Sequence, residues 1–153
     1  MGALRYLPSL KTIGTERFPG SRIFYQEFIE GLEEIKNSNT NCIDKLKQII
    51  ELHVNITSRN TNGMASLNND WMHLKDQLSY YLKLRVDYEN SFRAIIKKGV
   101  LNNEIKNINP DIMLFSILST LRSLYTWIPQ KEDLDAKILA SNLSEVLLKG
   151  INK

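Results

Sequence analysis

An arginine within an apolar surface is the residue in this sequence best placed to do chemistry. Read at the period of an α-helix, residues 78–99 place Arg85 near the centre of a face that is otherwise apolar and aromatic. The other members of that face are Leu78, Tyr81, Leu82, Tyr88, Phe92, Ile95 and Ile96. Two interpretations fit this position. Either Arg85 forms an ion pair with Glu89 one helical turn later, or it anchors the polar or negative group of a ligand.

The second interpretation predicts an apolar cavity lined by this helix and its neighbours. Small-molecule pockets are mostly apolar and carry a few well-placed polar groups. We therefore expect these ligand-binding residues: His53, Trp71, Tyr81, Arg85, Tyr88, Phe92, Met113 and Ile117. For His53 and for each aromatic residue, ordinary core packing is the alternative.

No residue pattern typical of catalysis or metal binding occurs in the sequence. The two histidines, His53 and His73, have no second ligand at metal-binding spacing, and Asp70-x-x-His73 alone is a weak signal. The chain has one cysteine, Cys42, and lacks a glycine-rich phosphate loop and a Gly-x-Ser-x-Gly turn. We expect a protein that is not an enzyme and that uses no cofactor or metal.

The composition is typical of one soluble helical domain. The chain has 153 residues, of which 42% are hydrophobic and 24% charged, and its net charge is +3. Lysine and glutamate are mixed along the chain, so the charge alone does not indicate a nucleic-acid surface. No apolar run is long enough for a secretory signal or a membrane span, and we therefore expect a cytoplasmic protein that does not insert into membranes.

Apolar periodicity predicts an all-α fold of six helices. The expected helices span about residues 21–36, 42–58, 64–72, 78–98, 110–128 and 132–149. Asn109-Pro110 is a strong start signal, and Gly99 is placed to end a helix in the left-handed conformation. Residues 1–20 lack periodicity and form an irregular N-terminal segment, so residues 21–153 make up the helical domain.

The last two helices carry more apolar surface than a monomer needs. From Ile112 to Ile128 the only charged residue is Arg122, so this helix must be covered on both sides. Small and apolar residues recur on the final helix at a spacing that lets two helices approach closely. We expect a homodimer in which the last two helices of each chain form a four-helix bundle. The expected interface residues are Ser116, Thr120, Ser123, Trp127, Ala136, Ala140, Leu143 and Leu147.

Three stretches together resemble a known family. They are residues 81–99, YLKLRVDYENSFRAIIKKG, then Asn109-Pro110 opening a leucine-rich helix, and Trp127-Ile128-Pro129 before a helix ending in LLKGI. Over residues 21–152 the chain is similar to the C-terminal regulatory domain of TetR/AcrR-family transcriptional regulators. The resemblance implies a homodimer formed by the last two helices and a ligand cavity between the preceding ones. Asn69-Asp70-Trp71 is similar to a subset that senses lipid-like ligands, which implies a small apolar or acyl-like ligand.

The N-terminal segment departs from that family. Its members begin with a helix-turn-helix built from three helices, whereas only residues 1–20 precede the helical domain here. Phe18-Pro19-Gly20-Ser21-Arg22 resembles the junction after the recognition helix, and residues 11–15 resemble a remnant of that helix. We expect a ligand-sensing and dimerisation domain whose DNA-binding part is truncated or degenerate, so that it binds DNA only if a helix-turn-helix is supplied or preserved. The alternative is a stand-alone helical interaction module without a ligand cavity.

Overall fold

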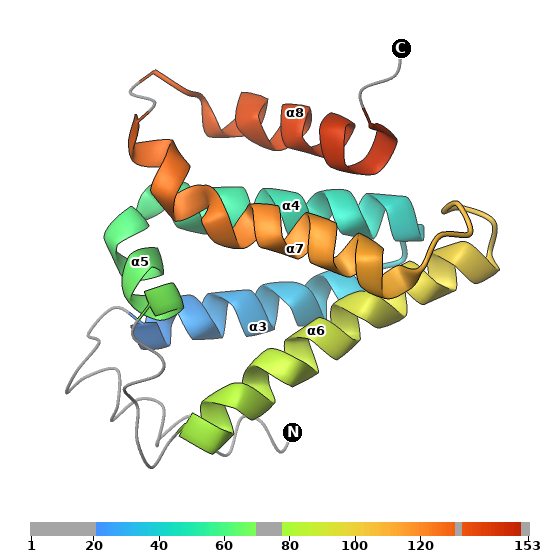
Figure 1. Ribbon diagram of the computed structural model, residues 1–153, viewed down its shortest axis with the longest axis horizontal. Coiled ribbons are helices and arrows are strands. Elements are labelled where there is room, and N and C mark those ends of the chain that lie inside the picture. The colour runs from blue at the N-terminus through green and yellow to red at the C-terminus, as the bar shows by residue number, and fades with distance from the viewer. Residues whose placement is uncertain (1–20, 70–77, 131–132, 151–153) are drawn as a thin grey trace.

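The computed structural model describes residues 21–69, 78–130 and 133–150 (Figure 1). Within these ranges the chain forms helices and no strands, which confirms the all-α prediction. The elements are α3 Ser21–Asn37, α4 Cys42–Arg59, α5 Thr61–Asn69, α6 Leu78–Leu101, α7 Pro110–Trp127, the short 3-10 helix η3 Ile128–Gln130, and α8 Ala136–Lys149. The expected irregular segment 1–20, with its predicted helix-turn-helix remnant, lies outside the described residues.

Polar side chains set the starts of the helices. Asn41 caps α4, because its side-chain oxygen accepts a hydrogen bond from the amide of Asp44 at 2.8 Å. Asn109 caps α7 in the same way and is followed by Pro110, so that start signal is confirmed. Asp135 caps α8, which therefore begins at Ala136 and not near residue 132 as expected.

The prediction that Gly99 ends a helix is wrong. Helix α6 continues through Gly99 to Leu101, and the left-handed residue of this turn is Asn103, with φ of 61°. The amides of Glu104 and Ile105 then donate to the Gly99 carbonyl at 2.8 and 3.1 Å. A Cβ atom at Gly99 would collide with the Ile105 side chain and come within 3.1 Å of Cys42 Cβ. This glycine serves close packing and not a change of backbone direction.

Helix α4 is the centre of the hydrophobic core. Figure 1 shows α8 along one side of α4 and α3 along the other, and α4 also contacts α6 and α7. Its residues Ile49, Ile50 and Val54 are completely buried. The surrounding core residues are Leu32, Ile35, Leu46, Phe92, Ile95, Ile96, Leu114, Ile117, Leu118, Leu121, Leu124, Leu139 and Ala140. Because α8 packs mainly on α4, the side of α7 that faces away from the core is left open.

None of the helices in the described ranges is both long enough and apolar enough to cross a membrane.

Candidate functional site

A histidine and a tyrosine from neighbouring helices are hydrogen-bonded inside the domain. His53 Nε2 on α4 lies 2.7 Å from Tyr88 Oη on α6, and His53 is only 5% exposed. The ring of Phe28 on α3 packs against both, with ring centroids 4.6 Å from His53 and 6.4 Å from Tyr88. Ile56 and Met64 pack beside Phe28. We call these five residues the His53–Tyr88 cluster.

Both polar members of the cluster are neutral at physiological pH. Burial lowers the pKa of His53 from 6.5 to about 3, and the positive charge of Arg122 adds to the effect. Burial also raises the pKa of Tyr88 well above its ordinary value of 10, although Arg122 opposes this shift. Their contact is therefore a hydrogen bond between uncharged groups.

An ion pair joins α6 to α7 next to this cluster. Arg122 Nη2 donates to Glu89 Oε1 at 2.8 Å, and each side chain is 30% exposed. Spacing along the helix offered Arg85 as one possible partner of Glu89. In the structure, Glu89 forms an ion pair with Arg122 on another helix. Because Glu89 directly follows Tyr88, α6 contacts α4 and α7 through adjacent residues.

Arg122→Met is expected to lower the free energy of unfolding by about 1–3 kcal/mol, because Glu89 would keep a partly buried charge without this partner. Adding Glu89→Gln should recover most of that loss, which urea unfolding of the single and double variants would measure. Lys83→Met is the control, since it removes an exposed pair with Asp87 and should cost less than about 0.5 kcal/mol. Equal losses in Arg122→Met and Lys83→Met would contradict the prediction.

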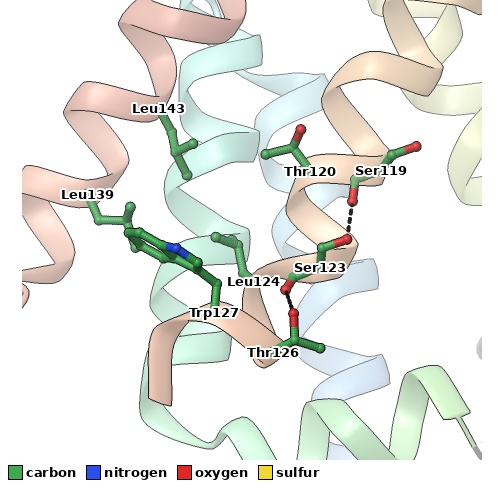
Figure 2. Close-up of a pocket in the computed structure, with 8 residues that line it drawn as sticks. All are labelled: Ser119, Thr120, Ser123, Leu124, Thr126, Trp127, Leu139 and Leu143. Atoms are coloured by element: carbon green, nitrogen blue, oxygen red, sulfur yellow. Dashed lines mark hydrogen bonds between the residues drawn. The ribbon is translucent and has the colours of Figure 1, made fainter. Parts of the chain in front are cut away.

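A groove of about 550 Å³ runs between α7 and α8 (Figure 2). Its lining residues are Ser119, Thr120, Ser123, Leu124, Thr126, Trp127, Leu139 and Leu143. Figure 2 shows the indole of Trp127 projecting from the end of α7 toward Leu139 on α8. Trp127 is 42% exposed, so one wall of the groove is apolar and open to solvent.

The hydroxyl groups along this side of α7 are bonded within the helix itself. Thr120 Oγ1 donates to the Ser116 carbonyl at 3.0 Å, and Ser123 Oγ donates to the Ser119 carbonyl at 2.9 Å. Thr126 Oγ1 likewise donates to the Ser123 carbonyl at 2.7 Å. Because these hydroxyls already have acceptors, they can leave water at little cost, and their small size allows another helix to approach closely.

Comparison with known proteins decides the family. Residues 39–151 match the family model described as tetracyclin repressor-like, C-terminal domain. The chain belongs to the TetR family of transcriptional regulators. No curated protein matches the chain in sequence at a significant level.

Solved structures of TetR-family proteins have the same fold. A TetR/AcrR-family regulator from Thermobifida fusca is 16% identical, with 87% of this chain and 71% of that chain covered and a TM-score of 0.75. PfmR from Thermus thermophilus is 18% identical, with 95% and 82% covered and a TM-score of 0.73. FadR from Bacillus subtilis, solved in complex with stearoyl-CoA, is 18% identical, with 87% and 75% covered and a TM-score of 0.68.

In this TetR-family domain, part of the predicted ligand-binding set comes together. His53 and Tyr88 form the cluster described above, and both are neutral. Phe92 and Ile117 are buried in the main core, and Met113 packs against that core. For these three residues the structure shows core packing, and their contact with a ligand stays a prediction.

Other members of the predicted set are less defined, and the set lacks Phe28 of the cluster and the buried Thr57 on the same helix as His53. Arg85 on α6 is half-buried, Trp71 lies outside the described residues, and the side chain of Tyr81 is not described. Phe28 and Thr57 were not among the expected ligand-binding residues, although both lie on the apolar stripes of their helices. Nothing in the sequence places the Phe28 ring against His53, because that contact joins separate helices.

The predicted dimer residues of α7 lie on one surface of the TetR-family domain. Thr120, Ser123 and Trp127 line the groove together with Leu143 of α8. Ser116 is exposed farther toward the start of α7. This arrangement agrees with the face expected from the sequence, and the interface itself stays a prediction.

The α8 residues predicted for the dimer interface contact the chain's own core, and their contact with a partner stays a prediction. Ala140 is 4% exposed and belongs to the chain's own core, and Ala136 and Leu147 pack against that core. Helix α8 packs on α4, and the small side chain of Ala140 suits such packing. The exposed apolar residues of α8 are Ile138 and Val146, and Val146 lies on the same side of the helix as Leu139 and Leu143.

Proposed function

We propose that residues 21–153 form the ligand-binding and homodimerisation domain of a TetR-family transcriptional regulator. The observation that carries this proposal is that α7 exposes large apolar side chains, among small hydroxyl residues, on the side that faces away from the core. One face is buried in the core, while the other exposes Ile112, Phe115 and Trp127, with Phe115 at 72%. Exposed apolar surface of this kind marks an interaction site, and a second copy of the chain is the proposed occupant.

The ligand half of the proposal is supported by the His53–Tyr88 cluster. It places an uncharged polar pair among apolar and aromatic side chains, which is typical of a site for a small organic molecule. The FadR structure from Bacillus subtilis holds stearoyl-CoA, and we propose a small apolar or acyl-like ligand for this chain.

The proposed ligand site is physically connected to the proposed dimer helix. A ligand that displaces Tyr88 would also move Glu89, the next residue on α6, and Glu89 holds Arg122 on α7. Ligand binding changes the relative position of α6 and α7 only if the ligand has a higher affinity for one relative position than for another. We expect the Glu89–Arg122 ion pair to couple ligand binding beside α6 to the position of α7.

DNA recognition is not assigned to the described helices, whose apolar faces form the domain core and the proposed dimer surface. The expectation that the DNA-binding part is truncated or degenerate concerns residues 1–20 and stays a prediction.

Sedimentation velocity and thermal melting of the full chain, with and without stearoyl-CoA, test both halves of the proposal. We expect a dimer in both conditions and a higher melting temperature with the lipid, because a ligand that binds the folded state stabilises it. A stable monomer at micromolar concentration would contradict the dimer half. A dimer whose melting temperature does not respond to stearoyl-CoA would favour the stand-alone interaction module.

A further inference from the structure

Two buried polar atoms on α4 have no hydrogen-bond partner among the described residues. They are His53 Nδ1 and Thr57 Oγ1, and Thr57 is completely buried. Residues four apart lie on the same side of a helix, so both atoms belong to one surface of α4. Buried polar groups in proteins are nearly always bonded, and two unbonded groups on one helix face indicate a missing acceptor or donor.

We assign Tyr88 as the donor in its contact with His53 Nε2, and this assignment makes His53 Nδ1 a donor that needs an acceptor. In the described part of the chain, the hydroxyl of Tyr88 has its hydrogen bond with His53 Nε2, and donation to that nitrogen satisfies the phenol proton. A neutral imidazole that accepts at Nε2 carries its own proton on Nδ1. His53 Nδ1–H is then a donor that lacks an acceptor, and the Thr57 hydroxyl can supply a second donor.

The surroundings of these donors favour an uncharged acceptor. Phe28, Ile56 and Met64 pack around this end of α4 and provide no charge. Arg122, whose charge acts on His53, is already held by Glu89 at 2.8 Å. A carboxylate placed there would lose its hydration without gaining Arg122 as a partner. A carbonyl oxygen has two lone pairs and could accept from both donors at a much smaller desolvation cost.

We propose that His53 and Thr57 together bind the uncharged carbonyl oxygen of an acyl ester or thioester. The ester or thioester carbonyl would accept hydrogen bonds from His53 Nδ1–H and Thr57 Oγ–H, while its apolar chain lies among the aromatic residues. This inference rests on the proposed ligand-binding function and specifies the head group of its ligand.

Methyl laurate and laurate provide a matched pair of probes, because they share one apolar chain and differ in the charge of the head group. Titration calorimetry with the full chain should show the ester binding about tenfold more tightly than the carboxylate. Equal binding of the two probes would overturn the proposal and leave the proposed function standing. Tighter binding of laurate would also overturn it and would favour Arg85 as an anchor. If the chain is a monomer and binds neither probe, that result would contradict both this proposal and the proposed function.

Thr57→Val tests the role of the hydroxyl separately from the fold. Valine replaces an unbonded hydroxyl with a methyl group of the same shape, so the melting temperature without ligand should stay the same or rise. The affinity for methyl laurate should fall about tenfold, because one donor to the carbonyl is lost. Ser58→Ala, at an exposed position on the same helix, should change neither quantity. A lower melting temperature with unchanged affinity would show that the hydroxyl serves the fold, or a bound water, and would overturn the proposal.

Discussion

Ser119→Glu is expected to convert the dimer to a monomer at micromolar protein concentration, whereas Ser119→Ala should remain dimeric. Ser119 is exposed on the outer side of α7 and lines the groove with Thr120 and Ser123. Glutamate there would bury an unpaired charge between closely packed helices, and two-fold symmetry would place it in the interface twice. We expect the dissociation constant to rise by at least about 100-fold.

Size-exclusion chromatography with light scattering would measure this change. Leu82→Glu adds the same charge at an exposed position on the first half of α6 and should leave the dimer intact. Because Ser119 is exposed in the single chain, its glutamate variant should keep the wild-type helix content by circular dichroism. If Ser119→Glu dimerises as tightly as Ser119→Ala, the interface lies on another face of the molecule.

Protonation of His53 is expected to lower the free energy of unfolding by about 2 kcal/mol between about pH 8 and pH 5. Burial holds the pKa of His53 at about 3 in the folded chain, compared with 6.5 for an accessible ring. Below pH 6.5 the unfolded chain therefore binds a proton that the folded chain does not, so acid favours unfolding. The stabilising contribution is present above pH 6.5 and is lost as the pH falls toward 3.

Urea unfolding of the wild type and of His53→Phe at both pH values checks this prediction. Phenylalanine keeps an aromatic ring beside Phe28 but leaves the Tyr88 hydroxyl without this partner, so absolute stabilities will differ. The informative quantity is the decrease in the free energy of unfolding from about pH 8 to pH 5, which should be about 2 kcal/mol larger in the wild type than in His53→Phe. The same loss in both proteins would mean that His53 takes up protons while the chain is folded.

Features that depend on neighbouring residues could be predicted from the sequence. Asn109-Pro110 begins α7 because one side chain caps the helix and the next residue tolerates the first helical position. The two faces of α7 also follow from helical periodicity alone. The same local reasoning failed at Gly99. The side chains of Ile105 and Cys42 leave no space for a Cβ atom there, and the residues next to Gly99 in sequence do not reveal this contact.

The candidate site depends more on contacts between helices and was predicted less completely. His53 and Tyr88 could be selected from the sequence as polar residues on apolar stripes. Their 2.7 Å hydrogen bond could not be predicted, because it joins two helices. Arg122 was noticed only as the single charged residue from Ile112 to Ile128, and its pairing with Glu89 depends on how α6 crosses α7. Ala140 has the small side chain expected at a dimer seam, but the same property suits the packing of α8 on α4.

Native mass spectrometry of the full chain tests directly whether one domain both dimerises and holds a small apolar molecule. The chain has a mass of 17.7 kDa, and we expect a complex of twice that mass. After incubation with methyl laurate, the dimer should carry at most one added ester per chain, and Thr57→Val should reduce that occupancy. A species of 17.7 kDa that retains no ester would contradict both dimerisation and ligand binding.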